Sequence, residues 1–72
     1  MDQNLFDLTR SQEEALAPYI EWKMGRKNTP SMSEIRRMSD YTYDVVNFTD
    51  EEYSDDFLEI HDELQNMLYL LS

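Results

Sequence analysis

The chain of 72 residues has no cysteine, one glycine and two prolines. Without cysteine it has neither a disulfide nor a thiolate metal site, which suits a reducing cytosol. So few turn-forming residues leave little material for hairpins, and strands are not expected. No apolar run approaches the roughly 18 residues that cross a bilayer, and the N-terminus lacks a signal-peptide pattern. We therefore expect a cytoplasmic, single-domain, all-α protein of a bacterial or infected host cell.

Basic residues are missing from the second half of the chain. All six lysines and arginines lie in residues 1–37, where six acidic residues balance them. The other ten acidic residues lie in residues 38–72, so this half carries the whole net charge of −10. Such a segment repels nucleic acids and anionic membranes and attracts basic proteins. The expected partner is a basic, nucleic-acid-binding protein, with no direct binding to nucleic acid or membrane.

Residue patterns that carry chemistry are also missing. His61 is the only histidine, and the di-iron pattern requires a glutamate where Leu58 stands. Residues 50–63 are rich in carboxylates but lack the glycine of a calcium-binding loop. There is no nucleophile elbow and no glycine-rich phosphate loop. We expect no catalytic residue, cofactor or metal, and hence no enzyme, with His61 at the edge of a helical bundle.

Three segments with helical periodicity follow one another. Each begins at a capping box, in which a Ser or Thr and an acidic residue three positions later satisfy free backbone N–H groups. Short turns join the segments, which predicts a small three-helix bundle. The expected elements are an N-terminal arm at residues 1–10 and helices at 11–25, 31–47 and 50–71, with capping boxes Ser11–Glu14, Ser31–Glu34 and Thr49–Glu52.

The first helix contains Pro18, which removes one backbone bond and crowds the preceding turn, so we expect a kink or break near it. Gly25 is the expected stop of this helix. Apolar side chains recur along one face of each helix, with heptad spacing in the third. These stripes are Leu16, Ile20 and Met24; then Ile35, Met38, Thr42 and Val45; then Tyr53, Phe57, Ile60, Leu64, Met67 and Leu71.

Acidic side chains gather on one face of the expected third helix. At 100° per residue they fall within a sector of about 140°, opposite the apolar stripe. Neighbours four positions apart are therefore like charges, and each pair is destabilising by about 0.2–0.5 kcal/mol. Their density over about 18 Å of helix lies between those of one and two DNA strands. The expected partner-binding residues are Glu51, Glu52, Asp55, Asp56, Glu59, Asp62 and Glu63.

This face predicts an inhibitor that mimics nucleic-acid phosphates and blocks the basic groove of a DNA- or RNA-binding protein. Small acidic proteins of phages and mobile elements often work in this way. The alternatives are an adaptor, antitoxin or transcription-factor-binding subunit that docks through an amphipathic helix, and a structural or oligomerising domain. Residues 67–71 are apolar nearly all round. Either the other helices wrap this segment or it makes a homodimer contact, and the sequence leaves both open.

The arrangement of charges in the expected bundle follows from its topology. In an up-down-up bundle, the turn between the first two helices lies near the C-terminal end of the third. Basic residues of that turn should approach the last two acids of the face and leave its first part uncompensated. The basic residues are Arg26, Lys27, Arg36 and Arg37, the acids are Asp62 and Glu63, and the expected centre of the face is Glu52, Asp55, Asp56 and Glu59.

Overall fold

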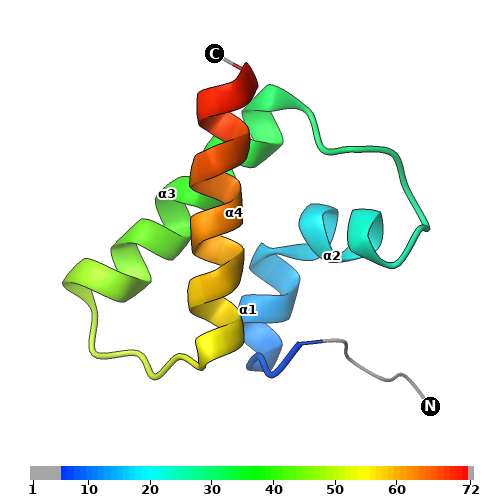
Figure 1. The fold of residues 1–72 in the computed structure, drawn as a ribbon. Helices are drawn as coiled ribbons and strands as arrows, with labels where there is room; N and C mark the ends of the chain where they lie inside the picture. The colour runs from blue at the N-terminus through cyan, green and yellow to red at the C-terminus, as the bar shows by residue number, and fades with distance from the viewer. Residues whose placement is uncertain (1–5, 72) are drawn as a thin grey trace.

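The computed structural model describes residues 6–71 (Figure 1). Within this range the chain forms four helices and no strand, which confirms the all-α expectation. The structure has four helices instead of the expected three, because the first expected segment, for which a kink or break near Pro18 was predicted, is divided into two. Residues 1–5 of the expected N-terminal arm and residue 72 lie outside the described residues. The helices are α1 (Arg10–Ala15), α2 (Ala17–Lys23), α3 (Met32–Phe48) and α4 (Asp55–Leu71).

The boundary between α1 and α2 lies at Leu16, whose φ and ψ of −105° and 16° are not helical. Pro18 is the second residue of α2, where a proline is tolerated because first-turn N–H groups have no helical partner. The Leu16 side chain is fully buried. The segment expected at residues 11–25 is therefore interrupted at a core residue just before the proline.

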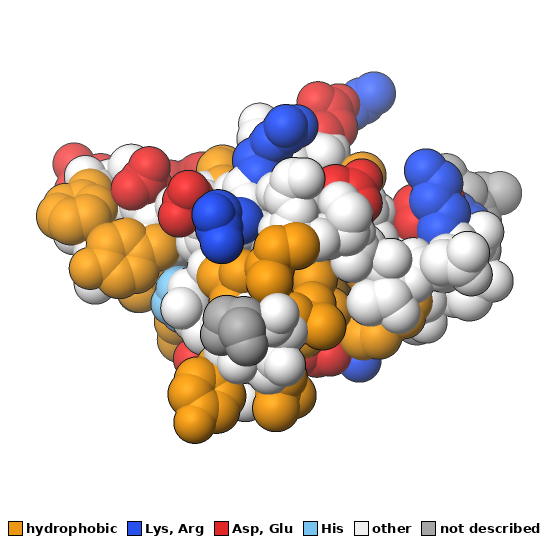
Figure 2. All heavy atoms as spheres, turned by 90° about the horizontal axis from the view of Figure 1, so that it is seen from above, with side chains coloured by type: hydrophobic (Ala, Val, Ile, Leu, Met, Phe, Trp, Pro, Cys, Tyr) orange, Lys and Arg blue, Asp and Glu red, His pale blue; other side chains and the backbone are white. Residues whose placement is uncertain are grey.

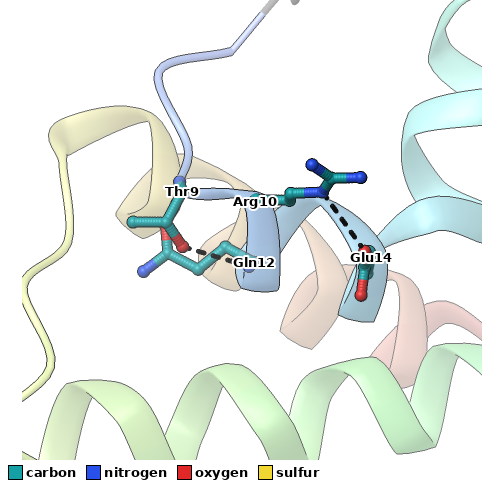
Figure 3. Close-up of polar contacts among 4 residues, drawn as sticks. All are labelled: Thr9, Arg10, Gln12 and Glu14. Atoms are coloured by element: carbon teal, nitrogen blue, oxygen red, sulfur yellow. Dashed lines mark hydrogen bonds and ion pairs between the residues drawn. The ribbon is translucent and has the colours of Figure 1, made fainter.

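The cap of α1 is not the expected Ser11–Glu14 pair. Thr9 Oγ1 accepts a hydrogen bond of 3.1 Å from Gln12 N, and Gln12 Oε1 accepts one of 3.0 Å from Thr9 N. Figure 3 shows this cap beside the Arg10–Glu14 ion pair on the outer surface of the helix. Gln12 is buried and donates from its amide to the carbonyl of Glu52, 3.0 Å away. Because Gln12 makes this contact with Glu52, the capping box forms between Thr9 and Gln12 and not between Ser11 and Glu14.

Gly25 ends α2 as expected, with a positive φ of 76°. Gly25 N donates to the carbonyl of Trp22, and Arg26 N donates to that of Glu21. These two bonds form a Schellman motif, which needs the left-handed conformation that glycine adopts without strain. The helix itself stops two residues earlier than expected, at Lys23.

The hydrophobic core lies mainly between α3 and α4, which run in opposite directions (Figure 1). Ser31 and Glu34 cap α3 as predicted, and all four residues of its stripe are buried. The stripe of α4 is buried only in its middle, since Tyr53 and Leu71 at its ends are exposed. The core residues are Leu16, Tyr19, Ile35, Met38, Val45, Phe57, Ile60 and Leu64.

The described chain is compact. Its radius of gyration is 11.7 Å, close to the value of about 11 Å expected for a folded chain of this length. Among residues 6–71, no helix combines the length and the hydropathy that spanning a membrane requires.

Candidate functional site

The acidic helix α4 begins at Asp55 rather than at residue 50, so the third predicted capping box is wrong. Ser54 Oγ accepts a hydrogen bond of 3.3 Å from Phe57 N, and the Ser54 carbonyl accepts the first helical bond from Leu58 N. Thr49 is instead the C-cap of α3, and its hydroxyl donates to the carbonyl of Val45 at 3.2 Å. The same hydroxyl accepts from Glu51 N at 3.3 Å, which forms a local turn.

A contact with the N-terminal segment accounts for the use of Ser54 as the cap. Its hydroxyl donates to the carbonyl of Asp7 at 2.5 Å, and Asp7 N donates to Oδ2 of Asp56 at 2.6 Å. The carboxylate of Asp56 also lies in the first turn of α4, where the helix dipole favours a negative charge. The N-terminal segment thus fixes the start of α4 from a distance of 47 residues in sequence.

The late start of α4 divides the predicted acidic face. Glu51 and Glu52 lie in the segment that connects α3 and α4, so neither has the predicted helical neighbour four residues later. The other five residues stay on α4 and within its first nine residues. These five are Asp55, Asp56, Glu59, Asp62 and Glu63.

Three of the seven predicted carboxylates interact with the protein itself. Asp56 accepts the bond from Asp7 N, and Glu63 accepts a hydrogen bond of 2.5 Å from the hydroxyl of Tyr19. Glu63 also lies 3.0 Å from Lys23 Nζ. Glu51 lies near the hydroxyl of Tyr41 and raises the pKa of that tyrosine, after the larger effect of burial. These carboxylates serve the fold and are poor candidates for partner contacts.

The remaining four carboxylates point into solvent. Glu52, Asp55, Glu59 and Asp62 are exposed, and none has a side-chain hydrogen bond or ion pair with another residue of the 6–71 range. Asp55, Glu59 and Asp62 follow one another on α4 at spacings of four and three, so they share one face. They span about 10 Å of helix at about 1.5 Å per residue. Three phosphates of one DNA strand span about 7 Å, so the carboxylates are somewhat more widely spaced than phosphates.

The cation that pairs with Glu63 is Lys23, which the sequence pattern did not identify. It pairs with Glu63 from α2 and lies 4.9 Å from the ring centre of Trp22. Within the described range no ion pair joins the four other basic residues, which were expected to approach Asp62 and Glu63, to either of these acids. Arg26, for example, pairs with Glu21 at 3.3 Å across the Gly25 turn. Within the described range no ion pair reaches Asp55, Glu59 or Asp62, although Lys23 lines the same surface hollow as Glu59 and Asp62.

His61 lies at the edge of the α3–α4 contact. Its Nδ1 is 2.7 Å from Oγ1 of Thr42, a fully buried hydroxyl that also donates to the carbonyl of Ser39 at 3.0 Å. One turn later on α4, Gln65 donates to the hydroxyl of Ser39. These contacts give His61 a structural partner. No group of three or more potential ligands in residues 6–71 is arranged to hold a metal ion.

Exposed apolar side chains form two further surface features, of which the sequence pattern indicated only the one within residues 67–71. Phe48 at the end of α3 is 71 % exposed, and its ring lies 5.7 Å from that of Tyr43. Tyr69 and Leu70 near the end of α4 are 79 % and 70 % exposed. Figure 2 shows hydrophobic side chains at the surface around the C-terminal end of α4 and, separately, at the left where α3 extends. The other described helices therefore leave Tyr69, Leu70 and Leu71 exposed, whereas Met67 and Leu68 pack against the core.

The described residues thus define a small all-helical protein with an exposed acidic surface and two exposed apolar areas. Comparison with known proteins gives no match: no family model, no curated protein and no solved structure is significantly similar to the chain.

Proposed function

We propose that this protein is an acidic binding protein and not an enzyme: an inhibitor that occupies the basic surface of a DNA- or RNA-binding protein in place of phosphates. The observation that carries the proposal is the row Asp55, Glu59 and Asp62, which is exposed on one face of α4 and forms no ion pair with any residue of the 6–71 range. Glu52 extends the row from the preceding segment. The carboxylates lie about 4.5–6 Å apart along the helix axis, which is wider than, but of the same order as, the spacing of about 3.4 Å between phosphates of one strand.

The acidic surface in this proposal is smaller than the sequence predicted. It is centred on Glu59 and excludes Glu51, Asp56 and Glu63, whose carboxylates lie near or contact other parts of the fold. A single strand of phosphates, rather than a duplex, is therefore the better geometric analogue. The proposal places the protein in the cytoplasm of a bacterial or phage-infected cell, where basic nucleic-acid-binding proteins are available.

A salt-dependent capture experiment tests the proposal. The intact protein is immobilised, incubated with nuclease-treated lysate of its host and eluted with a salt gradient. The captured partner is then competed with single-stranded and duplex DNA or RNA. Mimicry predicts a steep loss of affinity with salt and displacement by nucleic acid. A partner that holds nucleic acid and this protein together, with undiminished affinity for each, would overturn the proposal.

Two variants with equal net charge locate the contact on the acidic face. Glu59→Gln with Asp62→Asn removes two exposed charges from α4 and should weaken partner binding at least tenfold. Glu14→Gln with Glu21→Gln removes two charges near α1 and α2, where both residues pair with arginines. This control should bind within about twofold of wild type, since screening beyond about 8 Å leaves distant charges with little effect.

A second candidate function is an adaptor that docks through apolar side chains, and the exposure of Tyr69 and Leu70 favours it. Exposed tyrosine and leucine side chains can anchor in a groove of a partner, and such contacts respond little to salt. Tyr69→Ala would then abolish capture, whereas the Glu59 and Asp62 variant would not. Mimicry predicts the opposite pattern.

A further inference from the structure

The outward surface of the second half of α3 combines two aromatic rings with two carboxylates. Tyr43 and Phe48 are 49 % and 71 % exposed, with ring centres 5.7 Å apart. Asp40 and Asp44 lie on the same side of the helix, four residues apart, and both are exposed. We call these four residues the α3 surface. Figure 2 shows hydrophobic and acidic side chains next to each other at the left, where this half of α3 extends.

The fold explains neither the exposure of the two rings nor the presence of the two carboxylates. A phenylalanine that is 71 % exposed gains little from folding, because apolar side chains stabilise in proportion to the area they bury. Two exposed rings in contact form a patch rather than the isolated apolar residue that is normal on surfaces. Neither Asp40 nor Asp44 forms an ion pair with another described residue. Arg36 and Arg37 precede Asp40 on α3 and line one surface hollow with it, and no lysine or arginine follows them in the sequence.

We propose that the α3 surface binds an arginine-bearing basic segment of a partner protein, with guanidinium groups against Tyr43 and Phe48 and paired with Asp40 and Asp44. This inference rests on the proposed function in one respect, the basic character of the partner. It adds a second contact region, on α3, and a preference for arginine over lysine.

Charge selects this occupant among the alternatives. A second copy of the chain would bring another net charge of −10 and an identical acidic surface, so it is repelled. An acidic peptide, a nucleic acid or an anionic membrane is repelled by Asp40 and Asp44 for the same reason. A basic segment is attracted. Arginine fits better than lysine, because its planar guanidinium stacks on an aromatic ring while donating paired hydrogen bonds to a carboxylate.

The acidic row on α4 lacks this combination. Asp55, Glu59 and Asp62 offer carboxylates on an exposed helix face, but the row itself contains no aromatic ring and so lacks the stacking that favours arginine. The α3 surface adds rings, and His61 extends it, since its ring centre lies 6.4 Å from that of Tyr43. The α3 surface should therefore distinguish arginine from lysine more strongly than the acidic row on α4 does, and this difference provides the test.

The test is an NMR titration of the isotope-labelled, intact protein with a hexa-arginine peptide and, separately, a hexa-lysine peptide at low salt. Hexa-arginine should shift the amides of residues 40–48 and the ring signals of Tyr43 and Phe48. It should bind there several-fold more tightly than hexa-lysine. Tyr43→Ala with Phe48→Ala should weaken hexa-arginine binding at residues 40–48 by about five- to tenfold.

The matched control is Tyr69→Ala with Leu70→Ala, which removes two exposed apolar side chains from α4 and should leave binding at residues 40–48 unchanged. Asp40→Asn with Asp44→Asn keeps the rings and should weaken both peptides. Because all of these residues are exposed, the variants should keep the wild-type circular dichroism spectrum.

Two results overturn the inference. Equal affinity for both peptides at residues 40–48 would show simple charge attraction, and shifts confined to residues 55–62 would show that α3 is not a contact. Neither result affects the proposed function, which depends on Glu59 and Asp62 in the capture experiment. Conversely, arginine-selective shifts on α3 would stand even if the captured partner were indifferent to the Glu59 and Asp62 variant.

Discussion

The hydroxyl of Tyr19 donates a hydrogen bond of 2.5 Å to Oε1 of Glu63 and so joins α2 to α4. Lys23, one turn along α2, reaches the other carboxylate oxygen at 3.0 Å. Tyr19 is 2 % exposed, and its ring packs against those of Phe6 and Trp22. A residue of the predicted acidic face is thus part of the contact between two helices. This contact has a measurable dependence on pH.

Alkaline pH should destabilise the wild-type protein more than a Tyr19→Phe variant. Burial, followed by the hydrogen bond and charge of Glu63, raises the pKa of Tyr19 above its usual 10.0. The folded state therefore keeps this proton when the unfolded state loses it. The contribution to stability is full below about pH 10 and is lost as pH rises through the folded pKa.

Thermal melts followed by circular dichroism between about pH 9 and pH 11.5 should therefore fall more steeply for wild type than for Tyr19→Phe. Tyr41, whose pKa is also raised by burial, is present in both proteins and contributes equally to both slopes. Parallel slopes would mean that Tyr19 ionises as readily in the folded as in the unfolded state.

Replacement of Ser54 should destabilise the fold more than replacement of Thr49. Ser54 caps α4 and also bonds to Asp7, so Ser54→Ala should lower the free energy of unfolding by about 1 kcal/mol. For a domain of this size, that corresponds to a fall in Tm of about 4–8 °C. Thr49→Ala should lower Tm by less than half as much. The reverse order would mean that α4 begins at residue 50.

Gly25 should be replaceable by asparagine more readily than by alanine. A Cβ at this position meets no atom within 4 Å, so only the backbone conformation opposes a side chain. Its φ of 76° is strained for alanine, whereas asparagine tolerates this region. Gly25→Ala should cost about 1 kcal/mol in denaturant unfolding, and Gly25→Asn should cost clearly less. Equal losses would indicate that the left-handed turn does not form.

Local signals in the sequence predict the parts of this fold that local interactions determine. The Ser31–Glu34 cap and the stripe of α3 lie within one helix, and both are found as expected. The predicted starts of α1 and α4 are wrong, because the sequence offers two candidate capping residues at each start. Contacts across 40 or more residues favour the choice at both starts: Gln12 bonds to Glu52, and Ser54 bonds to Asp7.

The candidate site follows the same rule. Helical geometry correctly groups Asp55, Glu59 and Asp62, because their relation depends only on spacing within α4. It could not reveal that Glu63 is bonded to Tyr19, 44 residues away in sequence. Nor could it reveal the exposure of Phe48, since an apolar residue at a helix end is compatible with either burial or solvent. Tertiary packing decides both.

Repulsion within the acidic row should be visible in the stability of the protein. Asp55 and Glu59 are helical neighbours four residues apart, and Glu59 and Asp62 are three apart, so each pair is destabilising by about 0.2–0.5 kcal/mol at low salt. Salt screens such exposed charges, with a screening length of about 8 Å at physiological ionic strength and about 30 Å at 0.01 M. The three ion pairs of the described chain are partly or largely exposed and contribute little in the opposite direction.

Raising the ionic strength from about 0.01 to 0.15 M at neutral pH should therefore raise the Tm of the wild-type protein. Glu59→Gln with Asp62→Asn should melt higher than wild type at low salt and respond less to added salt, since the repelling charges are gone. Glu14→Gln with Glu21→Gln, which has the same net charge but removes residues that pair with arginines, should not melt higher than wild type. Thermal melts of the three proteins across the salt series make the comparison. A wild-type Tm that stays flat or falls would mean that attractive pairs outweigh the repulsion along α4, and the proposed acidic surface would lose its main support.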